Sequence, residues 1–329
     1  MTKIVHVGLP KCASTSLQVL FAEAKGTTYL GKGARPTPIE QFIADFKLKV
    51  LRIPTLRGSN YITKAVRDVF RETLPSEVEI TESMVLECRR AVDEGIGIFK
   101  GDTRHVLISD EVLSGAGFIY FNKPRRPLEG IIEGIGKIFG SEALVVVVMR
   151  SQISFLVSYW KHLVRTGYPF TFGYFLSQQS SDPVQADSWC SVTRSLFYDR
   201  IRRKAEEAGV RVAFVPFEDV VKEGRILREV FAREGVTLAP GLPHRRQSNT
   251  DESHIRKLKR NRTERRARGL MFDPALFERD EAVYQKVLSS GVLLDETPHQ
   301  ERLIEAFRPE NRAMAEATGY DLKAWKYPV

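Results

Sequence analysis

The sequence predicts an α/β protein with three layers, in which helices cover both faces of a central parallel sheet. Two apolar runs are the main observations behind this fold class. Residues 4–7 form a short run that ends at a loop of small residues, and a helical pattern follows the loop. Residues 144–149 are apolar at every position and β-branched at four of six, which is typical of a strand buried on both faces. A strand, a loop and a helix in this order form the repeating unit of a parallel sheet.

The loop after the first predicted strand, residues 8–16, has the composition of an anion-binding turn. Leu17, Leu20, Phe21 and Ala24 have the spacing of one buried helix face, so a helix begins directly after the loop. Backbone N–H groups and the positive end of the helix dipole then converge at the loop, which suits an anion of phosphate size. The other interpretation is an ordinary strand-to-helix turn that happens to be rich in small residues.

The position of Lys11 distinguishes this loop from the Walker A loop of ATP- and GTP-binding proteins. That loop has the pattern G-x-x-x-x-G-K-[ST], in which the lysine directly precedes the hydroxyl that holds Mg²⁺. Here Lys11 stands three residues before Ser14, and no second glycine occurs in the loop. The loop is therefore suited to a single phosphate with a lysine reaching past it, and not to a magnesium triphosphate.

Two further strands are predicted to bring polar side chains to the same edge of the sheet. Residues 105–108 form a buried strand that is followed by Ser109, Asp110 and Glu111, and Arg150 ends the second apolar run. Ligands of open α/β sheets collect at the carboxyl ends of the strands. An arginine side chain stays charged and can hold two phosphate oxygens at once, so Arg150 is a second candidate for binding an anion.

The remaining elements are assigned from the same periodicities. The helix predicted after Arg150 leaves Ser154 and Ser158 together on one face, away from its apolar residues. The other predicted elements are loops and short helices over 26–58, a helix over 194–208, a strand over 210–217 and a helix from 218 to about 234.

The chain is predicted to divide near residue 245. Residues 1–245 form the α/β domain in this prediction, with insertions of loop and helix around 26–82 and 115–140. Residues 246–329 are basic at first and mostly helical, and we expect them to pack on the same domain as an extension. We expect the basic run at 257–268 to form a solvated helix or to contact an anionic acceptor, and nonspecific binding of nucleic acid is the alternative.

The segment Pro-Lys-Cys-Ala-Ser-Thr-Ser at residues 10–16 resembles the 5′-phosphosulfate loop of sulfotransferases that use 3′-phosphoadenosine 5′-phosphosulfate. The resemblance is greatest to the bacterial and carbohydrate branches, where P-K-x-[AG]-[ST]-[ST]-[ST] is usual. Cys12 stands where those families more often have threonine or serine. Arg150 and Ser158, eight residues apart, resemble the arginine and serine with which the family binds the 3′-phosphate of the donor.

The resemblance implies a P-loop-like fold and a reaction in which a sulfuryl group passes from this donor to a hydroxyl, or less readily to an amine. The products are a sulfate ester and adenosine 3′,5′-bisphosphate, and a small-molecule or carbohydrate acceptor is implied, with no metal. The late segment 244–249 resembles the family's loop that returns to the 3′-phosphate. The donor-binding residues implied are Pro10, Lys11, Cys12, Ala13, Ser14, Thr15, Ser16, Arg150, Ser158, Arg246, Ser248 and Asn249.

Two residues are implied to be catalytic, Lys11 and Glu111. Lys11 would neutralise the leaving 5′-phosphate oxygen. Sulfotransferases that resemble this chain often have a glutamate in an S-x-E setting after the next core strand, which matches Glu111. Beside a negatively charged donor the pKa of a carboxyl rises, which helps it to take a proton from an alcohol. Asp110 is the second choice for this base, and a surface or capping role is the other interpretation of Glu111.

Composition and charge limit the remaining possibilities. Lysine and arginine number 50 against 41 acidic residues, and the net charge of +9 favours anionic partners. The three cysteines are isolated, which predicts neither a structural zinc site nor a disulfide framework. No apolar run is long enough to span a membrane and no signal peptide is recognisable, so a cytoplasmic protein is expected. The oligomeric state is left open.

Two other functions are alternatives at this point. A P-loop kinase with a degenerate loop would need Mg²⁺ and an acidic residue at the end of the long strand, where Arg150 stands. A basic nucleic-acid-binding protein would bind in a salt-sensitive way, but no specific nucleic acid is expected. His105 and His162 are alternative bases, and the six histidines form no metal-ligand pattern.

Overall fold

The computed structural model divides the chain into two compact units, which are described separately. The sheet unit comprises residues 1–150 and 194–244, and the helical unit comprises residues 151–193 and 245–329. The predicted boundary near residue 245 stays a prediction. The structure describes residues 2–9, 11–31, 73, 79–99, 105–110, 127–165, 172, 176, 193, 195–240, 256, 260, 285 and 300–329.

The sheet unit is built on a five-stranded sheet in which all neighbouring strands are parallel. The strand order is β2-β3-β1-β4-β5. All seven residues of β4 are buried, as the apolar run predicted, because layers of helices cover both faces. The strands are β1 (Thr2–Val7), β2 (Thr27–Gly31), β3 (His105–Asp110), β4 (Ala143–Met149) and β5 (Arg211–Pro216).

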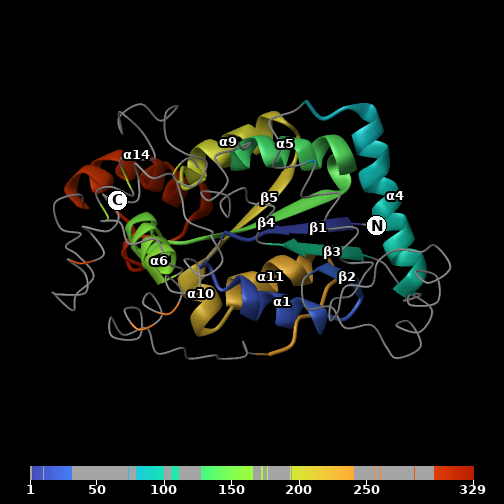
Figure 1. Cartoon of the computed structure of the whole chain (residues 1–329), viewed down its shortest axis with the longest axis horizontal. Helices are drawn as coiled ribbons and strands as arrows, with labels where there is room; N and C mark the ends of the chain where they lie inside the picture. The colour runs from blue at the N-terminus through green and yellow to red at the C-terminus, as the bar shows by residue number, and fades with distance from the viewer. Residues whose placement is uncertain are drawn as a thin grey trace. The chain divides into compact units, whose positions relative to one another are not determined.

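Helices cover both faces of this sheet, so the predicted three-layer α/β/α fold is confirmed. Figure 1 shows α5 and α9 on one face and α1 and α11 on the other, while α4 packs against β2 and α5. Phe21 and Phe231 stack with ring centroids 5.2 Å apart and join the two helices of the second face. The helices are α1 (Ser14–Ala22), α4 (Glu82–Phe99), α5 (Leu128–Phe139), α9 (Tyr198–Glu207), α10 (Phe217–Lys222) and α11 (Arg225–Arg233), with a short 3₁₀ helix, η3 (Gly140–Glu142).

Two local predictions are wrong. Residues 27–31 form the edge strand β2 and not loop or short helix, although the Thr-Thr-Tyr-Leu sequence there has a β-branched and aromatic character that favours a strand. The single helix predicted from 218 to about 234 is two helices, α10 and α11. Gly224 between them has φ of +60° and Asp219 Oδ2 accepts the N–H of Ile226 at 3.0 Å, so α10 ends and α11 begins there.

The order of the strands identifies the edge of the sheet at which a ligand would bind. β1 lies between β3 and β4. After β1 the chain leads to β2 and β3 on one side of it, and after β4 it leads to β5 on the other side. Neighbouring strands whose connections leave in opposite directions form a crevice at their carboxyl ends, where open α/β sheets bind ligands. The loops after β1 and β4 flank this point.

The helical unit pairs α6 (Gln152–Arg165) with α14 (Gln300–Thr318), and the C-terminal segment packs beside them. The buried side chains of Gln152 and Asn311 exchange two hydrogen bonds, of 2.6 and 3.1 Å. Asn311 Nδ2 also donates to the carbonyl oxygen of Pro328 at 2.7 Å, and Ser151 Oγ donates to that of Lys326 at 3.0 Å. A buried polar network of this kind is stable only when every member is paired.

None of the helices in the described part of the chain combines the length and the apolar composition needed to cross a bilayer.

Candidate functional site

The loop between β1 and α1 is folded by two residues in an unfavourable backbone conformation. Lys11 has φ of +67° and Ala13 has φ of +58°, in the left-handed region that residues other than glycine rarely adopt. The N–H of Cys12 donates to the carbonyl oxygen of Leu9 at 3.2 Å, and Ser14 Oγ donates to the same oxygen at 3.1 Å. These bonds hold the turn closed. Backbone strain of this type, about 1–3 kcal/mol per residue, is found mainly at functional sites.

The start of α1 presents backbone N–H groups that the helix itself does not use. The first helical hydrogen bond runs from Leu17 N–H to the carbonyl oxygen of Ala13 at 2.9 Å, and no side chain caps this end of the helix. The N–H groups of Ser14, Thr15 and Ser16 therefore have no partner within the helix. A left-handed residue followed by a helical one points successive N–H groups toward the same side, which forms an anion-binding concavity. This geometry suits one phosphate-sized anion.

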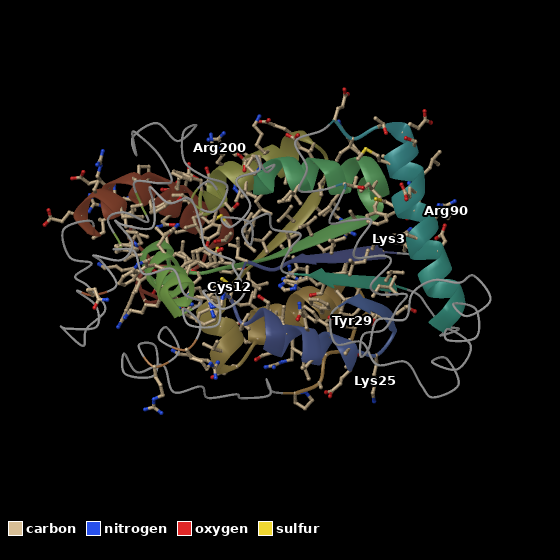
Figure 2. The ribbon with its side chains drawn as sticks, viewed as in Figure 1. Lys3, Cys12, Lys25, Tyr29, Arg90 and Arg200 are labelled. Carbon is tan, nitrogen blue, oxygen red and sulfur yellow. The ribbon has the colours of Figure 1, made fainter. Side chains whose placement is uncertain are left out.

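The hydroxyl groups of the loop differ in what they can do. Ser14 is buried, and its hydroxyl proton is engaged on Leu9, so this side chain holds the loop in shape. Ser16 is half-buried in the first turn of α1. Cys12 (Figure 2) is buried in the loop and forms no disulfide bond with another described cysteine. The side chain of Thr15 and all of Pro10 lie outside the described residues.

Gly8 is required at its position because His6 lies directly against it. A Cβ atom on Gly8 would lie 2.9 Å from His6 Cε1 and 3.3 Å from Ser14 Oγ. His6 is fully buried on β1, with Nδ1 2.8 Å from Ser109 Oγ on β3 and its ring edge against Phe21. Burial lowers the pKa of His6 to about 3, so its ring is neutral at physiological pH. The positive charge of the site therefore comes from other residues.

Arg150 brings the end of β4 into contact with the β1–α1 loop. Its Nη1 donates to the carbonyl oxygen of Lys11 at 2.7 Å, across 139 positions of sequence. The guanidinium carbon also lies 4.5 Å from the centre of the Phe217 ring, within the range of a cation–π contact. The two strand-to-helix corners that the sequence singled out therefore meet at the carboxyl edge of the sheet.

Tyr198 holds the backbone of Arg150 and was given no role by the sequence. Its hydroxyl accepts the N–H of Arg150 at 3.0 Å and donates to the carbonyl oxygen of Arg150 at 2.9 Å. Burial, with a smaller effect of the Cys12 thiol, raises the pKa of Tyr198 well above its ordinary value, so the phenol stays protonated. Its only sequence signal is a place at the start of an amphipathic helix, which predicts a core residue.

No family model matches the sequence, and no curated protein matches it either. The chain is similar to a solved sulfotransferase. That structure, described as a sulfotransferase from Alicyclobacillus acidocaldarius, has 15% sequence identity to this chain and a TM-score of 0.42. The match covers 80% of this chain and 96% of the other.

The roles of the other predicted site residues stay predictions. Glu111, Arg246, Ser248 and Asn249 lie outside the described residues, as does the side chain of Asp110, which ends β3 opposite Val7. Ser158 is half-buried on α6 in the helical unit, which also contains His162. His105 begins β3 and Asp110 ends it five positions later, about 16 Å along the strand, so His105 lies far from the carboxyl edge. Among the described residues no group of three or more His, Cys, Asp or Glu could hold a metal ion.

Proposed function

We propose that this chain transfers a sulfuryl group from 3′-phosphoadenosine 5′-phosphosulfate to a hydroxyl group. The observation that carries the proposal is the hydrogen bond from Arg150 to the β1–α1 loop at Lys11. It joins two cationic corners at the crevice where an α/β sheet binds its ligand. A donor with phosphate at both its 5′ and 3′ positions needs two such corners, whereas a donor with one phosphorylated position needs one.

In this proposal the loop and the start of α1 bind the 5′-phosphate. The N–H groups of Ser14, Thr15 and Ser16 donate to its oxygens, and Cys12 and Ala13 set the curvature of the loop after Pro10. Lys11 neutralises the charge that develops on the leaving oxygen as its bond to sulfur breaks. In transfers of this kind the protein has little covalent chemistry to perform. Hydrogen-bond donors and charges that are in place before the reaction are therefore the main source of catalysis.

Arg150 selects the donor by its 3′-phosphate, with Ser158, Arg246, Ser248 and Asn249 as the further contacts that the family resemblance implies. Glu111 follows β3, which pairs with β1, and takes the proton of the acceptor hydroxyl as its oxygen attacks sulfur. The products are the sulfate ester and adenosine 3′,5′-bisphosphate, so the atoms and charges balance without a metal. The acceptor is an alcohol, with a carbohydrate favoured over other classes by the resemblance of the loop.

A transfer assay with donor labelled at sulfur tests the proposal directly. The full chain is incubated with a panel of sugars and small alcohols, with and without a metal chelator, and labelled esters are separated from the donor. Transfer that the chelator does not affect and that Lys11→Ala abolishes supports the proposal. Lys25→Ala is the matched control, because Lys25 is exposed and lies before β2 at the amino edge of the sheet (Figure 2), so this variant should retain transfer.

Two results would overturn the proposal in favour of the other functions. Magnesium-dependent turnover of ATP, with no binding of adenosine 3′,5′-bisphosphate, is the result that a P-loop kinase gives. Salt-sensitive binding of DNA or RNA that adenosine 3′,5′-bisphosphate does not displace is the result that a nucleic-acid-binding protein gives.

A further inference from the structure

At the end of β4, the pairing with β5 stops one residue before Arg150. The pairing between β4 and β5 runs from Leu144 opposite Arg211 to Met149 opposite Pro216. Arg150 comes next, and there β5 has already turned into α10 at Phe217. The backbone N–H and C=O of Arg150 therefore need partners other than a continuing strand.

A single side chain supplies both partners. The hydroxyl of Tyr198 accepts from the N–H of Arg150 at 3.0 Å and donates to its C=O at 2.9 Å. A phenol offers one donor and can accept at the same atom, so it completes both backbone groups at once. A phenolate could not donate, and burial keeps this phenol neutral by raising the pKa of Tyr198.

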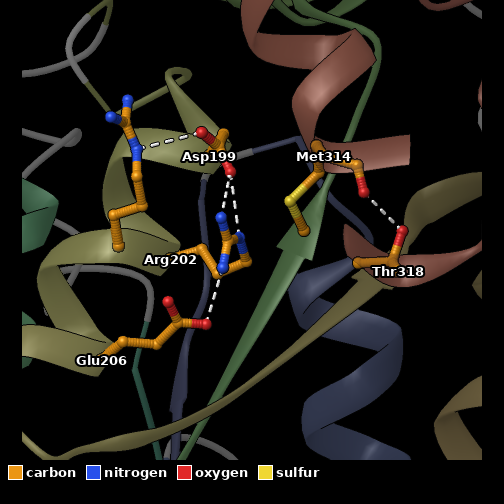
Figure 3. A network of polar contacts seen from close by, with 6 residues as sticks. Asp199, Arg202, Glu206, Met314 and Thr318 are labelled. Atoms are coloured by element: carbon orange, nitrogen blue, oxygen red, sulfur yellow. Dashed lines mark hydrogen bonds and ion pairs between the residues drawn. The ribbon is translucent and has the colours of Figure 1, made fainter. Parts of the chain in front are cut away.

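Tyr198 is itself held in place by the first turn of α9. It is fully buried, and its ring meets Phe214 of β5 edge to face with centroids 6.5 Å apart. The next residue, Asp199, is also buried and binds Arg202 at 2.7 Å (Figure 3). It also binds Arg203 at 3.0 Å. Glu206 extends this network by accepting from Arg202 at 2.6 Å. The hydroxyl is therefore presented from a fixed turn of helix.

The two hydrogen bonds between the Tyr198 hydroxyl and the backbone of Arg150, called the clamp below, determine the direction of the Arg150 side chain. With its backbone fixed at two points, Arg150 places its guanidinium over Phe217 and on the carbonyl oxygen of Lys11. We propose that Tyr198 is a positioning residue of the donor site, whose hydroxyl fixes the backbone of Arg150 so that the guanidinium faces the β1–α1 loop. This inference rests on the proposed function, because the direction of the guanidinium affects donor binding only when Arg150 binds the 3′-phosphate. A displacement of about 1 Å in a group of this kind is enough to weaken binding or catalysis strongly.

The test uses Tyr198→Phe, which keeps the ring and removes only the hydroxyl. Calorimetry measures the Kd of the full chain for adenosine 3′,5′-bisphosphate and for adenosine 5′-monophosphate. We expect the bisphosphate to bind about tenfold more weakly and the monophosphate to change by less than about threefold. Tyr29→Phe is the matched control, because Tyr29 is also buried in the sheet unit but lies on the edge strand β2, and its ratio of Kd values should equal that of the wild type. Equal weakening of both nucleotides by Tyr198→Phe would show a merely structural role and overturn the inference.

A double-mutant cycle shows whether the hydroxyl acts through Arg150. In the Arg150→Ala background, Tyr198→Phe should change the ratio of the two Kd values no further. The same change in both backgrounds would mean that Tyr198 acts independently of the guanidinium, and the inference would be wrong.

Backbone NMR separates this inference from the proposed function. If the wild type does not bind the bisphosphate more tightly than the monophosphate, the proposed function fails. The hydrogen bonds of Tyr198 to Arg150 are then tested by the exchange rate of the Arg150 amide proton. That rate should rise at least about tenfold in Tyr198→Phe, because the amide loses its partner. Should the variant not fold, the wild type itself decides: a cross-peak between the Tyr198 hydroxyl proton and the Arg150 amide proton supports the clamp, and its absence contradicts it.

Discussion

The guanidinium of Arg150 and the backbone of Lys11 are joined by a 2.7 Å hydrogen bond, although 139 positions separate the two residues. Lys11 lies in the loop after β1, Arg150 directly follows β4, and these two strands are neighbours in the sheet. The bond therefore follows from the topology of the sheet, which brings the two loops to one edge. It also makes the conformation of each loop depend on the other, because a change in the β1–α1 loop removes a partner of the arginine.

The close approach of His6 to Gly8 gives a prediction for the stability of the loop. Gly8→Ala should lower the free energy of unfolding by about 1–3 kcal/mol, because the new Cβ would lie 2.9 Å from His6 Cε1. Ala13→Gly should have the opposite sign and stabilise the chain by about 1 kcal/mol, since glycine adopts φ of +58° without the steric cost that alanine has. Denaturant unfolding followed by circular dichroism measures both. Equal effects of the same sign would contradict the loop conformation described above.

The buried neutral state of His6 predicts a dependence of stability on pH. The pKa of His6 is about 3 in the folded chain and about 6.5 when unfolded, so between these values the unfolded chain binds more protons. Stability from this residue is complete above pH 6.5 and is lost as the pH falls, by about 2 kcal/mol between pH 7 and pH 5. His6→Gln removes the titrating group. The difference between unfolding free energies at pH 7 and pH 5 should therefore shrink by about 2 kcal/mol in that variant, and an unchanged difference would show that His6 titrates normally.

The amide pair of the helical unit predicts a large loss of stability on truncation. Asn311→Ala removes three hydrogen bonds and leaves the buried side chain of Gln152 and the carbonyl oxygen of Pro328 without this partner, which should cost about 3 kcal/mol. Thr318→Ala is the control, because Thr318 is only half-buried and its Oγ1 bonds to nearby backbone alone, donating to the Met314 carbonyl oxygen (Figure 3) and accepting the N–H of Tyr320 at 3.3 Å, so this variant should cost about 1 kcal/mol.

Tryptophan fluorescence is the measurement suited to this comparison. All three tryptophans, Trp160, Trp189 and Trp325, belong to the helical unit, so their emission during denaturant unfolding reports on that unit. Similar midpoints for the two variants would mean that the buried amide pair contributes no more than the local hydrogen bonds of Thr318.

The fold could be predicted from the sequence because its signals are local. Continuous apolar runs predicted β1 and β4, and helical spacing predicted α1 and α9. The order of the strands is not local, and neither is the edge strand β2, whose place depends on pairing with β3. The break between α10 and α11 was missed because no pattern of apolar residues marks Gly224 as a helix end. Gly224 ends α10 through its positive φ, which a sequence does not show.

The candidate site could be predicted only where one residue type points to one chemistry. Lys11 in a loop of small residues and Arg150 at a strand end have that character, and the structure places them in contact. Tyr198 and His6 do not, because a tyrosine at a helix start and a histidine in an apolar strand both predict core packing. Their importance comes from hydrogen bonds to residues 48 and 103 positions away, which no local pattern contains.

The measurement that tests the central claim most directly is the effect of Arg150→Ala on nucleotide selectivity. The claim is that Arg150 grips the 3′-phosphate while the β1–α1 loop grips the 5′-phosphate of the same molecule. Calorimetry should show that the variant binds adenosine 3′,5′-bisphosphate about 100-fold more weakly, as expected when one charge-assisted contact to phosphate is lost, and adenosine 5′-monophosphate nearly as well as the wild type does. An equal loss of affinity for both nucleotides would contradict the claim, because Arg150 would then support the loop and not the 3′-phosphate.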